Sequence, residues 1–267
     1  MRKQHVDVIF CKGWYVALPV VIAWKILRKK IIVHESDTHP WLVNRIASRY
    51  ATKSFTGFDH IFPNAITIGQ ILSEDIIPTQ EGKLSEDFQN KITQIDKTKT
   101  ILLLTGWSQG AKTLYTSFLH VLEKHSDFWN FFQILVVLGK LNQDLQSSFE
   151  KQGIIVFDFL SQKEIGHCYH IADLCISRGG TTSLAEQKLF GIKTIIVPIP
   201  RTHDQMDNAK YYEKTFQDLV LDQDTNDFEQ QLEQTLIQLK NYKKTPKEIK
   251  KNDIIKAKET ILDTFFR

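Results

Sequence analysis

The stretch ILLLTGWSQGAK, residues 101–112, decides the fold class of this chain. Its first five residues predict a buried strand, and a loop with two glycines then leads into a helical pattern. A strand, a glycine-containing loop and a helix N-terminus together indicate an anion site in an α/β protein, because the free N–H groups of the helix face the loop. Trp107 stands inside this loop, where an indole would occupy the space of a ligand.

Similar apolar runs recur along the chain and alternate with helical patterns. They cover residues 6–10, 30–36, 132–140, 153–159, 172–180 and 193–200. Continuous Val/Ile/Leu runs separated by helices predict parallel sheets that are covered on both faces. Because the runs form two sets, we expect two Rossmann-like domains, residues 1–75 and 76–245, with a terminal helix in residues 246–267 that crosses back to the first domain. The first set has so few strands that we expect its opening strands to be missing from the chain.

The bulk composition is that of an ordinary globular protein. The chain has 267 residues, of which 42% are hydrophobic and 24% charged. A net charge of +3 does not predict a nucleic-acid partner. The three cysteines form no CxxC pair, so neither a zinc site nor a disulfide framework is indicated. The apolar run at residues 15–24 is too short to span a bilayer.

Three loops follow strands of the second set, and ligands of open α/β sheets bind beyond the carboxyl ends of the strands. The first loop offers Ser108, Gln109 and the amide of Gly110 to an anion, although a plain helix N-cap would look the same. In the second loop, Glu186 lies after a Gly-Gly pair and three hydroxyl residues, and its carboxylate can accept both hydroxyls of a ribose. The alternative for Glu186 is a capping box that serves the helix N-terminus.

The third loop, residues 198–212, follows a strand that ends in two prolines. Gln205 and Asn208 carry amides that donate and accept hydrogen bonds, which suits sugar hydroxyls. A solvated loop with an N-cap remains an alternative.

The three loops in this order resemble the donor-binding loops of the MurG family, the GT-B glycosyltransferases that add N-acetylglucosamine to the lipid-linked muramyl-pentapeptide precursor of peptidoglycan. The resemblance covers nearly the whole chain. It rests on HVDVIFCKGWYVALPVVIAW (residues 5–24), IIVHESDTHPWLVNRIASRYATK (31–53), LLLTGWSQGAK (102–112), ADLCISRGGTTSLAE (172–186) and PIPRTHDQMDNA (198–209). It implies a GT-B fold with a truncated first domain.

The resemblance also implies roles for individual residues. Glu186 would hold the ribose of UDP, and the backbone at Leu160 would read the uracil. Gln205 would bind the hydroxyls of N-acetylglucosamine, with Asn208 supporting its loop. The phosphates and the sugar would meet Thr181, Thr182, Ser183, Ser108 and Gln109. The acceptor side would include Tyr15, His34, Glu35 and Asp37, although Asp37 stands where the family usually has Asn.

The catalytic base is not identified in this chain. The family's usual candidate is a His on an opening Gly-rich loop, which is absent here. Inverting transfer would need no metal and no cofactor for the departure of UDP, because helix N-termini and loop amides can stabilise the leaving group. We therefore expect a UDP-sugar donor, an undecaprenyl-type lipid-linked acceptor and a membrane surface as partners.

Trp14, Trp41 and Trp107 align with glycines of the family. Glycine is used where φ is positive or where a ligand approaches closely, so tryptophan is an improbable replacement. We hypothesise that these three residues are glycines encoded by UGA and translated as tryptophan, and that Trp24, in an apolar helical stretch, is genuine. The rival interpretation is a degenerated protein that no longer binds the donor.

The helical stretch at residues 18–30 is the predicted membrane contact. Val21, Trp24 and Leu27 would form its apolar face, with a basic fringe beside it. The fringe consists of Lys25, Arg28, Lys29 and Lys30. The protein would then be peripheral on the cytoplasmic face of the cell membrane. The alternative is a helix that covers the sheet with its apolar face.

Two other functions remain open. A related GT-B transferase or a UDP-sugar epimerase would use similar donor loops, but an epimerase needs carboxylates and His residues around the sugar. A non-catalytic or inactive UDP-sugar-binding fragment is compatible with the absent opening loop.

Overall fold

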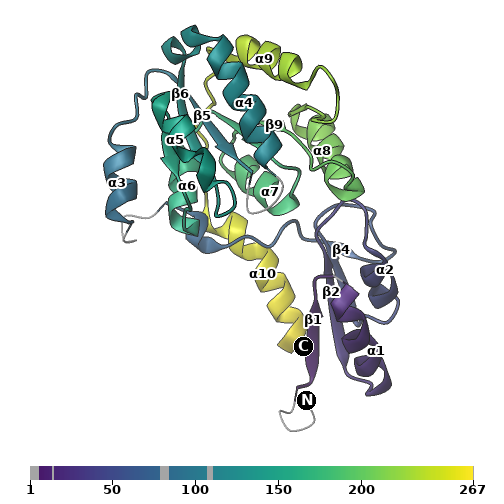
Figure 1. Ribbon diagram of the computed structural model, residues 1–267. Helices are drawn as coiled ribbons and strands as arrows, with labels where there is room; N and C mark the ends of the chain where they lie inside the picture. The colour runs from purple at the N-terminus through teal and green to yellow at the C-terminus, as the bar shows by residue number, and fades with distance from the viewer. Residues whose placement is uncertain (1–5, 14, 79–83, 107–110, 267) are drawn as a thin grey trace. The chain divides into compact units, whose positions relative to one another are not determined.

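The computed structural model describes residues 6–13, 15–78, 84–106 and 111–266. The chain divides into two compact units, one formed by Met1–Leu72 with Lys250–Arg267 and the other by Ser73–Ile249. Each unit is built on its own parallel sheet with helices packed on it (Figure 1). The predicted fold class, α/β with two Rossmann-like parallel sheets, is therefore confirmed.

The first unit has a four-stranded parallel sheet in the order β1-β2-β3-β4. Its elements are β1 (Val8–Cys11), η2 (Tyr15–Ala17), α1 (Leu18–Ile26), β2 (Lys30–Glu35), α2 (Leu42–Ser48), β3 (Lys53–Thr56), β4 (Ile66–Thr67) and α10 (Lys251–Phe266). Successive side chains of a strand point to opposite faces of the sheet. Ile31 and Val33 of β2 accordingly pack with Trp24 of α1, whereas Ile32 packs with Ile261 of α10. Both faces of this sheet are thus covered.

The second unit has a six-stranded parallel sheet in the order β10-β9-β8-β5-β6-β7. Its strands are β5 (Thr100–Thr105), β6 (Phe132–Val137), β7 (Ile155–Phe157), β8 (Leu174–Ser177), β9 (Lys193–Ile196) and β10 (Leu219–Val220). Its helices are η3 (Glu74–Ile76), α3 (Glu86–Ile92), α4 (Lys112–Lys124), η4 (Ser126–Asn130), η5 (Gln143–Leu145), α5 (Gln146–Lys151), α6 (Gln162–Ile171), α7 (Thr181–Leu189), α8 (His203–Phe216) and α9 (Phe228–Leu239). This is a doubly wound strand order, because the chain adds strands on one side of β5 up to β7 and then on its other side from β8 onward.

The central strand β5 is buried on both faces, as its unbroken aliphatic run predicts. Leu102 and Leu104 belong to the core cluster that also contains Phe118 of α4 and Leu232 of α9. Leu103, between them, points to the opposite face and is fully buried. The second unit therefore has the layered core on which its loops are mounted.

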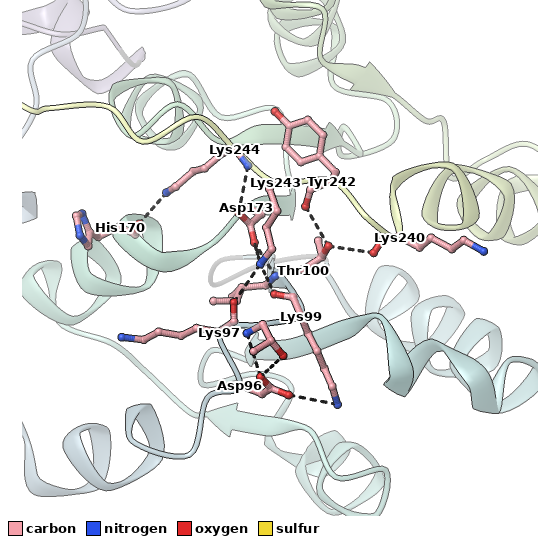
Figure 2. Close-up of polar contacts among 12 residues, drawn as sticks. Asp96, Lys97, Lys99, Thr100, His170, Asp173, Lys240, Tyr242, Lys243 and Lys244 are labelled. Atoms are coloured by element: carbon pink, nitrogen blue, oxygen red, sulfur yellow. Dashed lines mark hydrogen bonds and ion pairs between the residues drawn. The ribbon is translucent and has the colours of Figure 1, made fainter.

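The segment after α9 is hydrogen-bonded to residues at the amino ends of the strands of this sheet (Figure 2). Asp173, just before β8, accepts hydrogen bonds from the backbone N–H of Ile101 at 2.9 Å, the backbone N–H of Lys244 at 3.1 Å and Nζ of Lys243 at 3.0 Å. Nζ of Lys244 donates to the carbonyls of Tyr169 and His170 at 2.8 Å each. The hydroxyl of Thr100 donates to the carbonyls of Lys240 and Tyr242 at 3.0 Å each, so residues 240–244 are tied to the ends of β5 and α6.

Candidate functional site

The candidate site lies at the carboxyl ends of β5 and β8 in the second unit. In a doubly wound sheet, ligands bind beyond the carboxyl ends of the two neighbouring strands from which the chain continues to opposite sides of the sheet. The loops after these two strands separate there and leave a crevice. Here those strands are β5 and β8, which are hydrogen-bonded neighbours. Two of the three predicted loops, the one after β5 and the one after β8, therefore border this crevice.

The first loop leaves β5 at Gly106, and α4 begins after Ala111. The backbone N–H of Gly106 donates to Oη of Tyr115 at 2.8 Å, and that hydroxyl donates to the carbonyl of Val137 at 2.5 Å. A Cβ on Gly106 would lie 2.1 Å from Cβ of Ala111, so the start of the loop requires glycine. The predicted ligand contacts Ser108, Gln109 and Gly110 lie outside the described residues, as does Trp107.

The second loop leads from β8 through Gly179 and Gly180 into α7. A Cβ on Gly179 would lie 2.5 Å from the carbonyl oxygen of Gln205, so a close backbone approach requires this glycine. Gly180 is the N-cap residue of α7, and its lack of a side chain leaves the N–H groups of the first turn accessible to a ligand. In that turn Thr181 is buried, Ser183 is half-buried and Thr182 is exposed.

Glu186 projects from α7 into the interior, with 3% of its surface exposed. Its Oε1 accepts a hydrogen bond from Nε2 of Gln162 at 2.7 Å. Burial raises the pKa of Glu186 to about 7, and the hydrogen bond from Gln162 opposes that rise. The capping-box alternative is wrong, because Glu186 is the sixth residue of α7 and its carboxylate meets another helix. A buried carboxylate beside a neutral amide fits a site that receives hydroxyl donors.

The third loop is joined to the second by Gln205. Oε1 of Gln205 accepts from the backbone N–H of Gly179 at 3.2 Å and of Ile199 at 3.0 Å. Nδ2 of the buried Asn208 donates to the carbonyl of Gly179 at 3.4 Å. The side-chain oxygen of Gln205 thus holds the two loops together. Within the described ranges its NH₂ group has no hydrogen-bond acceptor, which leaves it for the predicted sugar contact. A cavity of about 220 Å³ borders this loop, lined by Pro198, Ile199, Pro200, Arg201, Thr202, Met206, Asp222 and Asp224.

Leu160 lies in the loop between β7 and α6 and is buried. The next residue, Ser161, forms a capping box with Glu164 that fixes the start of α6. Sequence reasoning missed Gln162, the residue inside this box that reaches Glu186. The Ser-x-x-Glu spacing at residues 161–164 was the available signal, because it predicts a helix start directly after the proposed uracil contact.

The predicted acceptor-side residues His34 and Glu35 are both buried within the first unit. Nε2 of His34 lies 3.0 Å from the carbonyl oxygen of Gly69, and burial lowers the pKa of His34 to about 4, so the ring is neutral. Glu35 accepts from the backbone N–H of Asp37 and Trp41 and from Nδ2 of Asn44, at 2.9–3.1 Å.

The side chains of His34 and Glu35 thus shape the loop after β2, and their acceptor-side role stays a prediction. Tyr15 is exposed, and Asp37 is half-buried with Oδ2 accepting from Nε1 of Trp41 at 3.2 Å.

The glycine argument does not hold at Trp41. Its backbone has φ −60° and ψ 147°, which any residue adopts, and its side chain is exposed. Trp24 is 2% exposed in the core of the first unit, as expected for a genuine tryptophan. Trp14 and Trp107 lie outside the described residues, so for them the recoding hypothesis stays a prediction.

The predicted membrane face of α1 is wrong for Val21 and Trp24, because both pack on the sheet. Leu27 and the basic fringe of Lys25, Arg28, Lys29 and Lys30 are exposed. The outward apolar residues of α1 are instead Ile22 and Ile26, which are 50% and 74% exposed. No helix among the described residues is long and apolar enough to cross a membrane.

A larger cavity, of about 330 Å³, lies at the opposite, amino-terminal edge of the second sheet. It is bordered by the segment after α9 that Figure 2 shows, in which Lys243 and Lys244 donate hydrogen bonds to backbone carbonyls. The part of the chain that the structure describes contains no group of three His, Cys, Asp or Glu side chains placed to hold a metal ion. An Asp-x-Asp sequence does follow β10, and there Oδ1 of Asp222 accepts from the backbone N–H of Asp224 at 3.0 Å.

Residues 100–265 match the glycosyltransferase family 28 C-terminal domain, and residues 1–56 match the glycosyltransferase family 28 N-terminal domain. The chain is 30% identical over 263 residues to the UDP-N-acetylglucosamine--N-acetylmuramyl-(pentapeptide) pyrophosphoryl-undecaprenol N-acetylglucosamine transferase of Staphylococcus aureus, covering 92% of this chain and 71% of that protein. It is 29% identical to the protein of the same name from Staphylococcus epidermidis, with the same coverage.

Two solved structures share the fold. MurG of Acinetobacter baumannii aligns with a TM-score of 0.67 and 21% identity, over 97% of this chain and 71% of that one. The UDP-GlcNAc 2-epimerase of Neisseria meningitidis, bound to UDP-GlcNAc, aligns with a TM-score of 0.69 and 11% identity, over 99% of this chain and 77% of that one. Because the two TM-scores are similar, the fold alone does not separate a transferase from an epimerase.

Proposed function

The chain belongs to glycosyltransferase family 28, and from this premise we propose that it transfers N-acetylglucosamine from UDP-N-acetylglucosamine to the lipid-linked muramyl-pentapeptide precursor of peptidoglycan. The S. aureus transferase, which resembles both units of the chain, supports this assignment over an epimerase. The observation that carries the donor half of the proposal is the buried carboxylate of Glu186 beside the open N-terminus of α7.

In the proposed complex, UDP occupies the crevice at the carboxyl ends of β5 and β8. The ribose hydroxyls donate to Glu186, and the N–H groups of the first turn of α7 meet the diphosphate. Backbone groups at Leu160 read the uracil, and the NH₂ group of Gln205 meets the sugar. The acceptor hydroxyl attacks the anomeric carbon with inversion while a general base takes its proton. The bond between that carbon and UDP breaks, and the helix dipole stabilises the negative charge on the departing UDP. The reaction needs no cofactor in this scheme.

We also propose that the first unit contacts the bilayer that holds the lipid-linked acceptor, on its cytoplasmic face. Ile22 and Ile26 are exposed on α1, where Lys25 lies between them in the sequence, and the exposed Arg28 and Lys29 follow directly after the helix. An exposed apolar stripe with basic neighbours is typical of an interfacial helix. Each lysine or arginine near an anionic surface adds on the order of 1 kcal/mol to such binding.

The test is a transfer assay with UDP-N-acetylglucosamine labelled in the sugar and a lipid-linked acceptor in anionic vesicles. The proposal expects label in the lipid fraction, with release of UDP that depends on the acceptor, and loss of both with Glu186→Ala. Epimerised UDP-sugar without label in the lipid would identify an epimerase. Donor binding with no conversion of either kind would identify a non-catalytic UDP-sugar-binding protein.

A further inference from the structure

Gln162 connects two of the proposed donor loops. It is the first residue of α6, two positions after Leu160, and its Nε2 donates to Oε1 of Glu186 on α7 at 2.7 Å. The two helices follow different strands, β7 and β8. A side-chain contact between them therefore links the loop proposed to read the base to the carboxylate proposed to hold the ribose.

The backbone of Gln162 is fixed by the capping box around it. Oγ of Ser161 accepts from the backbone N–H of Glu164 at 3.3 Å, and Oε2 of Glu164 accepts from the backbone N–H of Ser161 at 2.9 Å. Oε1 of Glu164 also accepts from the N–H and the hydroxyl of Ser85, at 3.0 and 2.6 Å. Because the side chains of Ser161 and Glu164 are both hydrogen-bonded, the backbone at Gln162, which lies between them, is held in one position.

The contact has a defined orientation and leaves acceptor capacity unused. A carboxylate only accepts, so the amide of Gln162 must present its NH₂ group to Glu186. The hydrogen bond occupies one lone pair of Oε1. No other described residue donates a hydrogen bond to this carboxylate, so Oε2 and the second lone pair of Oε1 remain for hydroxyl donors, which matches the two neighbouring hydroxyls of a ribose.

We propose that Gln162 is a positioning residue that orients the carboxylate of Glu186 toward both hydroxyls of the donor ribose, and so lets the site distinguish ribose from 2′-deoxyribose. This inference rests on the proposed donor site. A ligand without the 2′-hydroxyl should bind less tightly than UDP. One acceptor position of the buried carboxylate then has no donor, so the cost of removing it from water is no longer offset. The preference for ribose then depends on the orientation of the carboxylate as well as on its presence.

The experiment compares the affinities of the full chain for UDP and for 2′-deoxy-UDP by titration calorimetry. Gln162→Met keeps the length of the side chain and removes the donor, and Gln162→Ala is the second variant. Gln146→Met is the matched control, because Gln146 is also the first residue of a helix, α5, and donates from Nε2 to Oε1 of Glu150 at 2.7 Å, on an exposed surface.

We expect the unmodified chain to prefer UDP by roughly tenfold or more. Gln162→Met should reduce this ratio several-fold in a chain that still unfolds in a single cooperative thermal transition, whereas Gln146→Met should leave the ratio intact. If Glu186→Ala abolishes the preference and both Gln162 variants keep it, the positioning role is wrong and the donor site stands. If Glu186→Ala changes neither the affinity for UDP nor the ratio, the ribose assignment itself fails.

Discussion

Replacing Glu186 by glutamine is expected to stabilise the ligand-free chain at alkaline pH. Burial raises the pKa of Glu186 from 4.5 to about 7. Between these values the folded chain binds more protons than the unfolded chain, so its stability falls as the pH rises through that window. At about 1.4 kcal/mol per pH unit, the ionised carboxylate costs the folded chain about 3 kcal/mol above pH 7. Glutamine removes this cost and still accepts from Gln162.

The measurement is urea denaturation of both proteins at about pH 4 and about pH 8, which bracket the window. The stabilisation by Glu186→Gln should be small at the lower pH and about 3 kcal/mol at the higher pH, while the affinity for UDP falls. Glu150→Gln, at the exposed partner of Gln146, should show no such pH dependence. Equal differences at both pH values, or a destabilised variant at about pH 8, would refute the reasoning.

Three further predictions concern other parts of the chain. Asp173→Ala should lower the free energy of unfolding by about 2–3 kcal/mol in denaturant melts, because a strand amide and the segment after α9 lose their acceptor. Gly166→Ala should lower it by about 1–3 kcal/mol, since a Cβ there would lie 1.9 Å from the carbonyl oxygen of Ile76; unchanged thermal unfolding would mean that the backbone shifts freely. The pair Ile22→Glu and Ile26→Glu should reduce co-sedimentation with anionic vesicles without destabilising the chain, because both side chains are exposed. Undiminished sedimentation would remove α1 from the membrane contact.

The sheets were predictable because their strands are long apolar runs. The run at residues 101–105 is buried on both faces, and this burial is what an unbroken aliphatic sequence indicates. The two-residue strands β4 and β10 give no such signal, since their pairing depends on neighbours that fold beside them. The sequence also did not predict which face of α1 packs on the sheet. Its residues are apolar on more than one side, so periodicity does not decide whether Trp24 or Ile26 packs on the sheet.

The candidate site was predictable where residue type and loop position agree. Glu186 follows a glycine pair at the start of a helix, and it lies buried beside the crevice as that position indicates. His34 and Glu35 look equally functional in the sequence. The structure adds that His34 bonds to Gly69 and Glu35 to Asn44, which are partners that only the fold brings near. Residue type and position after a strand therefore do not tell which hydrogen-bond partners the fold will supply to a polar side chain.

The most direct measurement is a crystal structure of the chain with UDP. Both ribose hydroxyls should lie within hydrogen-bonding distance of the Glu186 carboxylate, with the diphosphate at the first turn of α7 near Thr181. A ribose remote from Glu186, or UDP bound in the cavity beside Lys97 and Lys244 at the amino-terminal edge of the sheet, would contradict the donor site and the glycosyl transfer proposed from it.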